Sequence, residues 1–87
     1  MGYHLDFTDK AKEDIAEHKK AGNRAILKKL HTLLEELAEH PFTGTGKPEP
    51  LKGNLSGMWS RRINRGNRLV YEVEEDAVSI LSAKGHY

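Results

Sequence analysis

The strongest constraint on the fold is a run of aliphatic residues that recurs at helical spacing between positions 26 and 38. Residues three and four apart lie on the same side of a helix, so this run predicts one broad apolar face and the main element of the core. Asn23 can cap the start of this helix. An end near Glu39 is expected, because Pro41 disfavours helical backbone just before it. The apolar face consists of Ile26, Leu27, Leu30, Leu33, Leu34, Leu37 and Ala38.

Two shorter signals precede this helix. Residues 3–7 alternate between apolar and polar side chains, which is the period of a short half-buried strand. Thr8 can cap a helix over residues 9–21, Asp9 suits the positive end of its dipole, and Gly22 stops it. The residues expected to face inward from this helix are Ala11, Ile15 and His18.

The second half of the chain begins with a long loop. Residues 41–57 contain all three prolines and four of the eight glycines. Connections longer than about 12–15 residues without secondary structure are usually functional in a compact domain. Beyond the loop, the pattern predicts an antiparallel meander of three strands joined by polar turns. The strands are expected over residues 59–63, 69–74 and 78–83, with turns at 64–67 and 75–76.

The order strand, helix, helix, strand, strand, strand predicts an α+β domain. We expect the two N-terminal helices to pack on one face of a twisted, mainly antiparallel four-stranded sheet and to leave the other face free. The length of 87 residues suits a single domain over residues 1–87. The chain has no cysteine, no apolar run of signal-peptide length and no apolar segment near the ~20 residues that span a bilayer. We therefore expect a cytoplasmic protein without a membrane partner.

The net charge of +1 hides an uneven distribution of charge along the chain. Residues 1–46 hold seven Lys or Arg against eight Asp or Glu, and residues 69–87 hold one against four. A local cluster of cations concentrates positive potential where a phosphate chain can dock. Charge alone does not separate this reading from a solvated basic loop. The cluster, here called the basic block, spans residues 47–68 and holds Lys47, Lys52, Arg61, Arg62, Arg65 and Arg68 against the single acid Glu49.

The second half also contains an acid and a base of the types that cleave RNA without a metal. Such cleavage needs a base for the 2′-hydroxyl proton and an acid that protonates the leaving 5′-oxygen. Glu49 is a carboxylate at neutral pH and can serve as the base. His86 titrates near neutrality and can serve as the acid. Each has a simpler interpretation, because Glu49 lies between two prolines in a loop, and His86 and Tyr87 end the chain, where backbones usually fray.

Cations of the basic block can stabilise the charge that develops on phosphorus. Arg68 and Arg62 can hold a phosphate through two hydrogen bonds each, and Lys52 can add a point charge. Lys47 and Arg61 are expected to contribute to the same phosphate contacts. The alternative is that Arg61 and Arg62 are ordinary strand arginines, one of them paired with an acidic residue of a helix.

The remaining aromatic and imidazole side chains carry less information. Tyr87 offers an aromatic face on which an unstacked base can lie, whereas Trp59 is expected in the core because its indole is large and its neighbour is apolar. The other four histidines show no spacing typical of a metal site, so we expect neither a metal nor a cofactor. They are His4, His18, His31 and His40.

Four separated motifs cover residues 41–87 almost without gaps: PFTGTGKPEPLK from Pro41, NLSGMWSRRI from Asn54, NRLVY from Asn67, and the terminal His86-Tyr87. Together they resemble the YoeB (Txe) toxins, members of the RelE-like group of ribosome-dependent messenger-RNA interferases. Residues 1–40 match only in pattern. The chain departs from the family at Lys84-Gly85, where an arginine and an aromatic residue are expected, so the stacking surface near the site is expected to be smaller.

The resemblance implies the toxin of a type II toxin–antitoxin system with a RelE-like fold. It implies an endoribonuclease that cuts messenger RNA in the A site of the 70S ribosome, near 16S ribosomal RNA, by metal-independent acid–base catalysis. The product is a 2′,3′-cyclic phosphate, and translation is inhibited. A homodimer and a cognate YefM-like antitoxin that folds over the toxin are implied as well. The roles implied are general base for Glu49, general acid for His86, transition-state stabilisation for Arg68, orientation of RNA for Tyr87, and phosphate contacts for Lys52 and Arg62.

Two other functions stay open. A toxin of the RelE fold can instead act by protein contact, as the ParE-like topoisomerase inhibitors do. Such a toxin has no need of an acid–base pair, so the presence of Glu49 and His86 argues against it. A non-catalytic RNA-binding module would need the basic block alone, and it should lose little if His86 were replaced by alanine.

Overall fold

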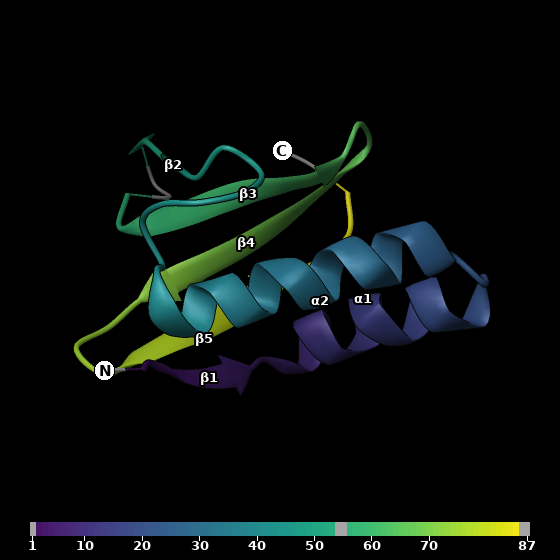
Figure 1. Cartoon of the computed structure of the whole chain (residues 1–87), viewed down its shortest axis with the longest axis horizontal. Helices are drawn as coiled ribbons and strands as arrows, with labels where there is room; N and C mark the ends of the chain where they lie inside the picture. Colours follow the sequence, from purple (N-terminus) through teal and green to yellow (C-terminus); the bar gives the residue numbers. More distant parts are fainter. Residues whose placement is uncertain (1, 54–55, 86–87) are drawn as a thin grey trace.

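The computed structural model describes residues 2–53 and 56–85, and two helices and five strands lie within these ranges (Figure 1). The sequence-based boundaries agree with the observed ones to within about two residues for every element that was predicted. In chain order the elements are β1 (His4–Phe7), α1 (Asp9–Lys20), α2 (Arg24–Glu39), β2 (Glu49–Pro50), β3 (Met58–Asn64), β4 (Asn67–Val73) and β5 (Ala77–Ser82).

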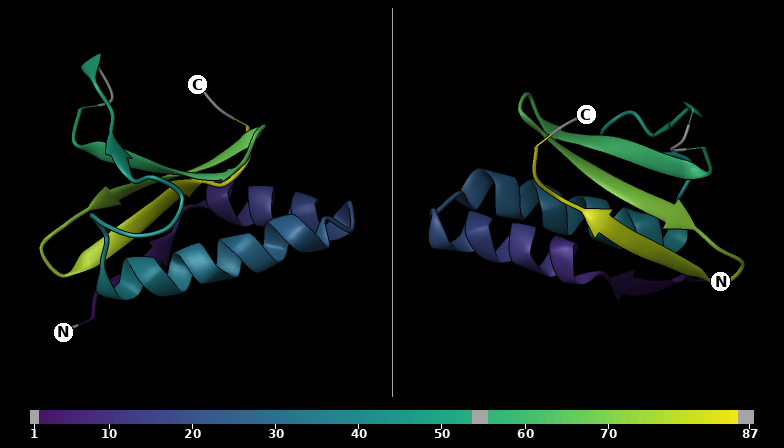
Figure 2. Two further views of the ribbon diagram at one scale, coloured as in Figure 1. Left: turned by 45° about the horizontal axis from the view of Figure 1, so that its top comes forward. Right: turned by 180° about the vertical axis from the view of Figure 1, so that it is seen from behind.

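The strands form one mixed sheet in the order β1-β5-β4-β3-β2. β1 runs parallel to β5, and the other neighbours are antiparallel. Both helices lie on one face of the sheet (Figure 2), which confirms the predicted α+β arrangement. The predicted strand count of four is wrong, because β2 adds a fifth strand at the edge beside β3. β2 is only two residues long and lies in the proline-containing loop, so it produces no alternation in the sequence.

The ends of the helices follow from local chemistry. The Thr8 hydroxyl accepts a hydrogen bond from the Ala11 N–H at 3.1 Å, so Thr8 caps α1 as predicted. Gly22 adopts a φ of 71°, a left-handed conformation that glycine tolerates best, and α1 ends just before it. Asn23 stands at the start of α2 but makes no capping bond with its side chain. Its amide instead lies 3.4 Å from Nδ1 of His18.

The core lies between α2 and the helix-facing side of the sheet. Leu30, Leu33 and Leu37 of α2 are buried against residues of β4 and β5 that are themselves inaccessible to water, and burial of such apolar area is the main stabilising term of folding. Trp59 packs against this core as a partly buried residue, as predicted. Neither α1 nor α2, the helices of the described ranges, has the length and apolar character that crossing a membrane requires.

The side chains of β3 alternate between the helix-covered face of the sheet and the opposite face. Successive residues of a strand point to opposite sides. Arg61 points toward α2, where it contacts Glu36, so Ser60 and Arg62 point to the face that carries no helix. This open face is the one that the sequence left free, and the residues of the candidate site lie on it.

Candidate functional site

Glu49 and Arg68 form an ion pair on the open face. The Arg68 Nη2 atom lies 2.6 Å from Oε1 of Glu49. The sheet brings them together because β2 pairs with β3, placing Glu49 opposite Ser60, and β3 pairs with β4, placing Arg62 opposite Arg68. Directly opposite residues of antiparallel strands share a face. The Glu49 side chain is 59% exposed and the Arg68 side chain 19% exposed, so a partly shielded guanidinium holds an accessible carboxylate.

Ser60 fixes the other end of the same guanidinium. Its hydroxyl accepts a hydrogen bond from Nε of Arg68 at 3.1 Å, and Ser60 itself is fully buried. Arg68 is therefore held at Nε by β3 and at Nη2 by β2 before any ligand arrives. The sequence-based prediction missed Ser60. The signal that could have found it is the alternation of β3, which places Ser60 on the face of Arg62.

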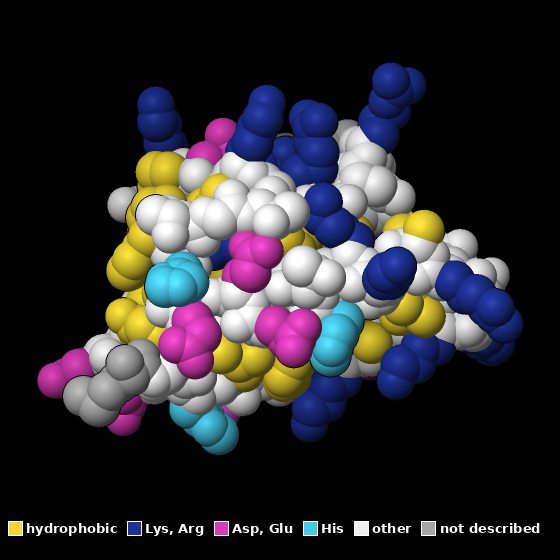
Figure 3. Space-filling view, viewed as in Figure 1, with side chains coloured by type: hydrophobic (Ala, Val, Ile, Leu, Met, Phe, Trp, Pro, Cys, Tyr) yellow, Lys and Arg dark blue, Asp and Glu magenta, His cyan; other side chains and the backbone are white. Residues whose placement is uncertain are grey.

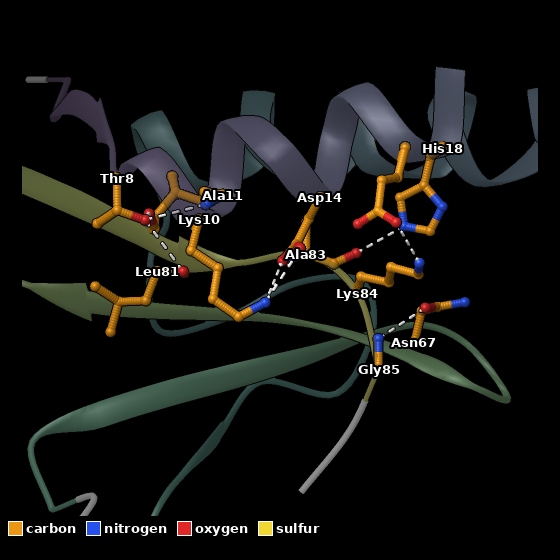
Figure 4. A network of polar contacts seen from close by, with 12 residues as sticks. Thr8, Lys10, Ala11, Asp14, His18, Asn67, Leu81, Ala83, Lys84 and Gly85 are labelled. Carbon is orange, nitrogen blue, oxygen red and sulfur yellow. Dashed lines mark hydrogen bonds and ion pairs between the residues drawn. The ribbon is translucent and has the colours of Figure 1, made fainter. Parts of the chain in front are cut away.

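The backbone of Arg68 also binds Gly85, which lies close to the end of the chain. The Arg68 N–H donates to the Gly85 carbonyl at 2.9 Å, and the Gly85 N–H donates to Oδ1 of Asn67 at 2.9 Å (Figure 4). Gly85 is thus bound through both of its backbone groups to the start of β4. His86 follows it directly in the chain. His86 and Tyr87 lie outside the described residues, so their roles stay predictions.

Three further cations of the basic block that were predicted to contact phosphate are exposed. They are Lys47 and Lys52 in the loop and Arg62 on β3. Lys and Arg side chains project from the side of the molecule that carries β2 and β3 (Figure 3). The structure therefore leaves these residues accessible to a polyanion, and their contact with phosphate stays a prediction. Within residues 2–53 and 56–85, no three His, Cys, Asp or Glu side chains are grouped so that they could hold a metal ion.

Arg61 does not belong to this surface, and the prediction that it binds phosphate is wrong. Its side chain is fully buried, with Nη1 2.9 Å from Oε1 of Glu36. Nη2 donates to the carbonyls of His40 at 2.5 Å and Thr43 at 2.7 Å. These bonds use the guanidinium inside the protein, where phosphate has no access. The alternative that one strand arginine pairs with an acidic helix residue is confirmed for Arg61.

The Arg61 contacts tie the beginning of the loop to α2 and the sheet. Nε of Arg61 donates to the Tyr71 hydroxyl at 3.2 Å, and that hydroxyl donates to the Pro41 carbonyl at 2.8 Å. Burial raises the pKa of Tyr71, while the neighbouring Arg61 charge opposes this rise. Further along the loop, the Gly46 carbonyl accepts from the Arg62 N–H at 2.7 Å. The loop therefore leaves α2 along a fixed path and enters β2 at Glu49.

The hydrogen bonds from Thr45 to Glu36, together with the ion pair to Arg61, predict a loss of stability in acid. The hydrogen bond from the Thr45 hydroxyl lowers the pKa of Glu36 most; partial desolvation opposes it, and the Thr45 N–H and the Arg61 charge lower it further. A carboxyl with a lowered pKa stabilises the folded state fully above its ordinary value of 4.5, and this contribution is lost as the pH falls through the lower, folded-state pKa.

We therefore expect the free energy of unfolding to decrease as the pH falls below about 4.5. The free energy of unfolding of the Glu36→Gln variant should depend less steeply on pH in that range. Urea unfolding at a series of pH values measures this. Glu35→Gln, which changes an exposed neighbour, should leave the slope of the wild type unchanged. Equal slopes for wild type and Glu36→Gln would contradict the assignment.

The architecture has close counterparts among solved structures. It superposes on a YoeB/ParE toxin from Agrobacterium tumefaciens with a TM-score of 0.91 and 32% identity, covering 97% of this chain and 99% of that one. It superposes on the YoeB dimer structure from Staphylococcus aureus with a TM-score of 0.87 and 38% identity, covering 98% of both chains. The arrangement of two helices on a mixed sheet thus places the chain, by its fold, among small bacterial toxins of this kind.

The sequence comparisons narrow this class. A family profile described as the YoeB-like toxin of bacterial type II toxin–antitoxin systems matches residues 7–87. The toxin YoeB of Streptomyces coelicolor is 45% identical over 83 residues, which cover 95% of this chain and 98% of that toxin. The chain therefore belongs to the family of YoeB-like toxins of type II toxin–antitoxin systems, and the resemblance seen in its second half is confirmed.

Proposed function

We propose that this toxin is a ribosome-dependent endoribonuclease that cuts messenger RNA in the ribosomal A site by acid–base catalysis. The observation that supports it is that Arg68 binds two different segments, one through its side chain and one through its backbone. Its side chain pairs with Glu49, and its backbone binds Gly85, the residue before His86. The segments that carry the proposed base and cation therefore meet at β4, and the residue before the proposed acid is bound to the same strand.

In the proposed reaction, the Glu49 carboxylate accepts the proton of the 2′-hydroxyl as that oxygen attacks the neighbouring phosphorus. Arg68 stabilises the negative charge that develops on the non-bridging oxygens. His86 donates a proton to the 5′-oxygen as its bond to phosphorus breaks. The products are a 2′,3′-cyclic phosphate and a 5′-hydroxyl. Tyr87 orients the RNA, and Lys47, Lys52 and Arg62 bind its phosphates.

The ion pair between Glu49 and Arg68 suits this sequence of events. In the absence of RNA, the Glu49 carboxylate occupies the Nη2 donor of Arg68. A phosphate brings competing anionic oxygens to the same donors, and arginine binds phosphate well in a bidentate geometry. Because Ser60 keeps its bond to Nε, the guanidinium stays oriented while Nη2 turns to the phosphate. Glu49 is then free to accept a proton.

A single 2′-deoxynucleotide in the message tests the proposed nucleophile. A messenger RNA with deoxyribose 5′ of the mapped scissile phosphate should resist cleavage on programmed ribosomes, whereas the same substitution three nucleotides away should be cut like all-ribose RNA. The all-ribose products should carry a 5′-hydroxyl that polynucleotide kinase labels without prior phosphatase treatment. Cleavage of the deoxy-substituted site at the rate of the all-ribose RNA would contradict attack by the 2′-hydroxyl.

The two alternative functions give different results in the same system. A ParE-like inhibitor would leave every message intact while still arresting growth. A non-catalytic RNA-binding module would slow translation without producing cleaved ends. Either result, obtained with a folded and toxic preparation, would contradict the proposed endoribonuclease.

We also propose a YefM-like antitoxin as partner, a homodimer as the free form and the cytoplasm, where ribosomes translate, as the location. Support comes from the Staphylococcus aureus relatives, which are described as a YoeB dimer and as a YoeB–YefM complex. An acidic, partly disordered partner can fold over a cationic surface on binding. Sedimentation of the isolated toxin should show a species larger than the 9.8 kDa chain at micromolar concentration; a species of only that mass would remove the dimer.

A further inference from the structure

Two buried polar side chains of α1, Asp14 and His18, have no part in the proposed reaction. Asp14 is 3% exposed and His18 2% exposed. They lie four residues apart and therefore on the same side of the helix. Burying a carboxylate or an imidazole is costly unless specific partners compensate. Each of them binds one backbone group of the same residue, Ala83, which is itself fully buried.

The two helix side chains hold Ala83 from both sides. The Ala83 N–H donates to Oδ2 of Asp14 at 2.9 Å. Nε2 of His18 lies 2.9 Å from the Ala83 carbonyl and carries the hydrogen of this bond, because a carbonyl oxygen only accepts. Asp14 and His18 each have a further side-chain partner. Lys10 binds both carboxylate oxygens of Asp14 at 3.0 and 3.1 Å, and the Asn23 amide lies 3.4 Å from Nδ1 of His18.

These bonds begin where the sheet stops. β5 ends at Ser82, so the backbone groups of Ala83 are bound by α1 side chains in place of a strand ladder. Two residues later, the Asn67 side chain binds the Gly85 N–H (Figure 4), and the Arg68 N–H binds the Gly85 carbonyl. Four backbone groups within residues 83–85 are thus fixed by partners on α1 and β4. We name the three side chains that take part, those of Asp14, His18 and Asn67, the tail clamp.

We propose that the tail clamp is a set of positioning residues for His86. This inference rests on the proposed function. The last residues of a domain usually fray unless they are tied down, yet a general acid must lie within hydrogen-bond reach of the leaving oxygen. A displacement of about 1 Å in a catalytic group can cost about 10²-fold in rate. The clamp fixes the chain up to the residue before the proposed acid.

The test measures single-turnover cleavage by saturating toxin on programmed ribosomes, together with the affinity for those ribosomes. His18→Leu removes the donor to Ala83, and we expect a rate about 10- to 100-fold lower with an affinity within about threefold of the wild type. His18→Gln places an amide N–H near the position of Nε2 and should recover most of the rate. Asn67→Ala, in a more exposed position, should lower the rate in the same direction, and Asn67→Asp, which keeps the acceptor, should restore it.

A double-mutant cycle with His86 separates positioning from general damage. If the clamp acts through His86, then His18→Leu should change the residual rate of His86→Gln by less than about twofold, because residues that act as a unit are not additive. Two variants serve as controls and should retain the wild-type rate. Ile15→Ala weakens the same helix away from the tail, and Lys84→Ala removes the exposed contact at 2.9 Å to Glu17.

The outcomes distinguish this inference from the proposed function. If the wild type does not cut, or if His86→Gln cuts as fast as the wild type, the proposed function fails and the tail clamp fails with it. If both behave as proposed but His18→Leu and Asn67→Ala keep the full rate, only the tail clamp is overturned. The same holds if His18→Leu lowers the rate equally with and without His86, or if Ile15→Ala lowers it as much.

Discussion

Replacing Arg61 by methionine is expected to lower the free energy of unfolding by about 3–5 kcal/mol, the usual cost of breaking a buried ion pair by removing one partner. Methionine fills similar space but removes the cation beside Glu36 and the hydrogen bonds to the carbonyls of His40 and Thr43 and to the Tyr71 hydroxyl. For a chain of this size, a loss of 3 kcal/mol lowers the melting temperature by roughly 12–24 °C. Thermal unfolding followed by circular dichroism measures the shift.

Two variants show whether the loss comes from the buried network. Arg61→Lys keeps the charge but lacks the planar fork that reaches several acceptors at once, so it should recover only part of the stability. Arg62→Met removes the exposed neighbour on the opposite face and should change stability by no more than about 0.5 kcal/mol. If Arg61→Met melted like the wild type while its affinity for RNA fell, Arg61 would be a phosphate ligand after all.

Replacing Arg68 by alanine is expected to lower the rate of messenger-RNA cleavage by about 10²–10³-fold, the range seen when one donor to a developing oxyanion is lost. The effect should appear in the single-turnover rate more than in the affinity for the ribosome, because the proposed stabilisation acts on charge that appears only in the transition state. Arg68→Lys should be nearly as slow. A lysine ammonium cannot hold Glu49 and Ser60 at the distances of 2.6 and 3.1 Å with one planar group.

Ser60→Ala offers a graded comparison for the same side chain. It removes one orienting hydrogen bond and leaves the charge, so we expect a loss of about 10-fold, between the wild type and Arg68→Ala, with little change in ribosome affinity. The backbone bond from Arg68 to Gly85 does not depend on the side chain and should persist in all these variants. A rate for Arg68→Lys equal to that of the wild type would show that a point charge suffices and would contradict the bidentate role.

The helices and the central strands could be predicted because their signals are local. The aliphatic spacing between Ile26 and Ala38 fits a helix and no other regular structure. Thr8 marks the start of α1 through its capping hydroxyl, and Gly22 marks its end through its left-handed backbone. β2 could not be predicted in this way. A strand of two residues exists only because β3 offers it a partner, and that pairing depends on a contact formed across the loop.

Arg61 shows where the sequence carried more information than the prediction used. The alternation of β3 places Trp59 and Arg61 on the same side, and Trp59 was already expected in the core. Arg61 therefore had to face inward, with an acidic partner on a helix. Composition obscured this, because all six cations of the basic block contribute equally to a count of charge, whichever way their side chains point.

The contacts within the site could not be predicted from the sequence, because they depend on the fold. Resemblance to a family placed Glu49 and Arg68 among the site residues, but their contact depends on the register of three strands. The positions of Ser60 and Asn67 beside Arg68 and Gly85 likewise follow from strand pairing and not from motif spacing. Asp14 and His18 carry no motif at all, and only their distance to Ala83 identifies what they hold.

The most direct measurement is cleavage of a defined messenger RNA in a purified translation system, mapped by primer extension, with the wild type beside Glu49→Ala and His86→Ala. Glu13→Ala, which removes an exposed carboxylate on α1, controls for the loss of an acid outside the site. We predict wild-type and Glu13→Ala cuts within A-site codons, and cuts at least about 10²-fold slower in the other two variants, as expected for lost acid–base help. An intact message in the presence of folded, growth-arresting wild type, or full activity in either site variant, would contradict the acid–base endoribonuclease.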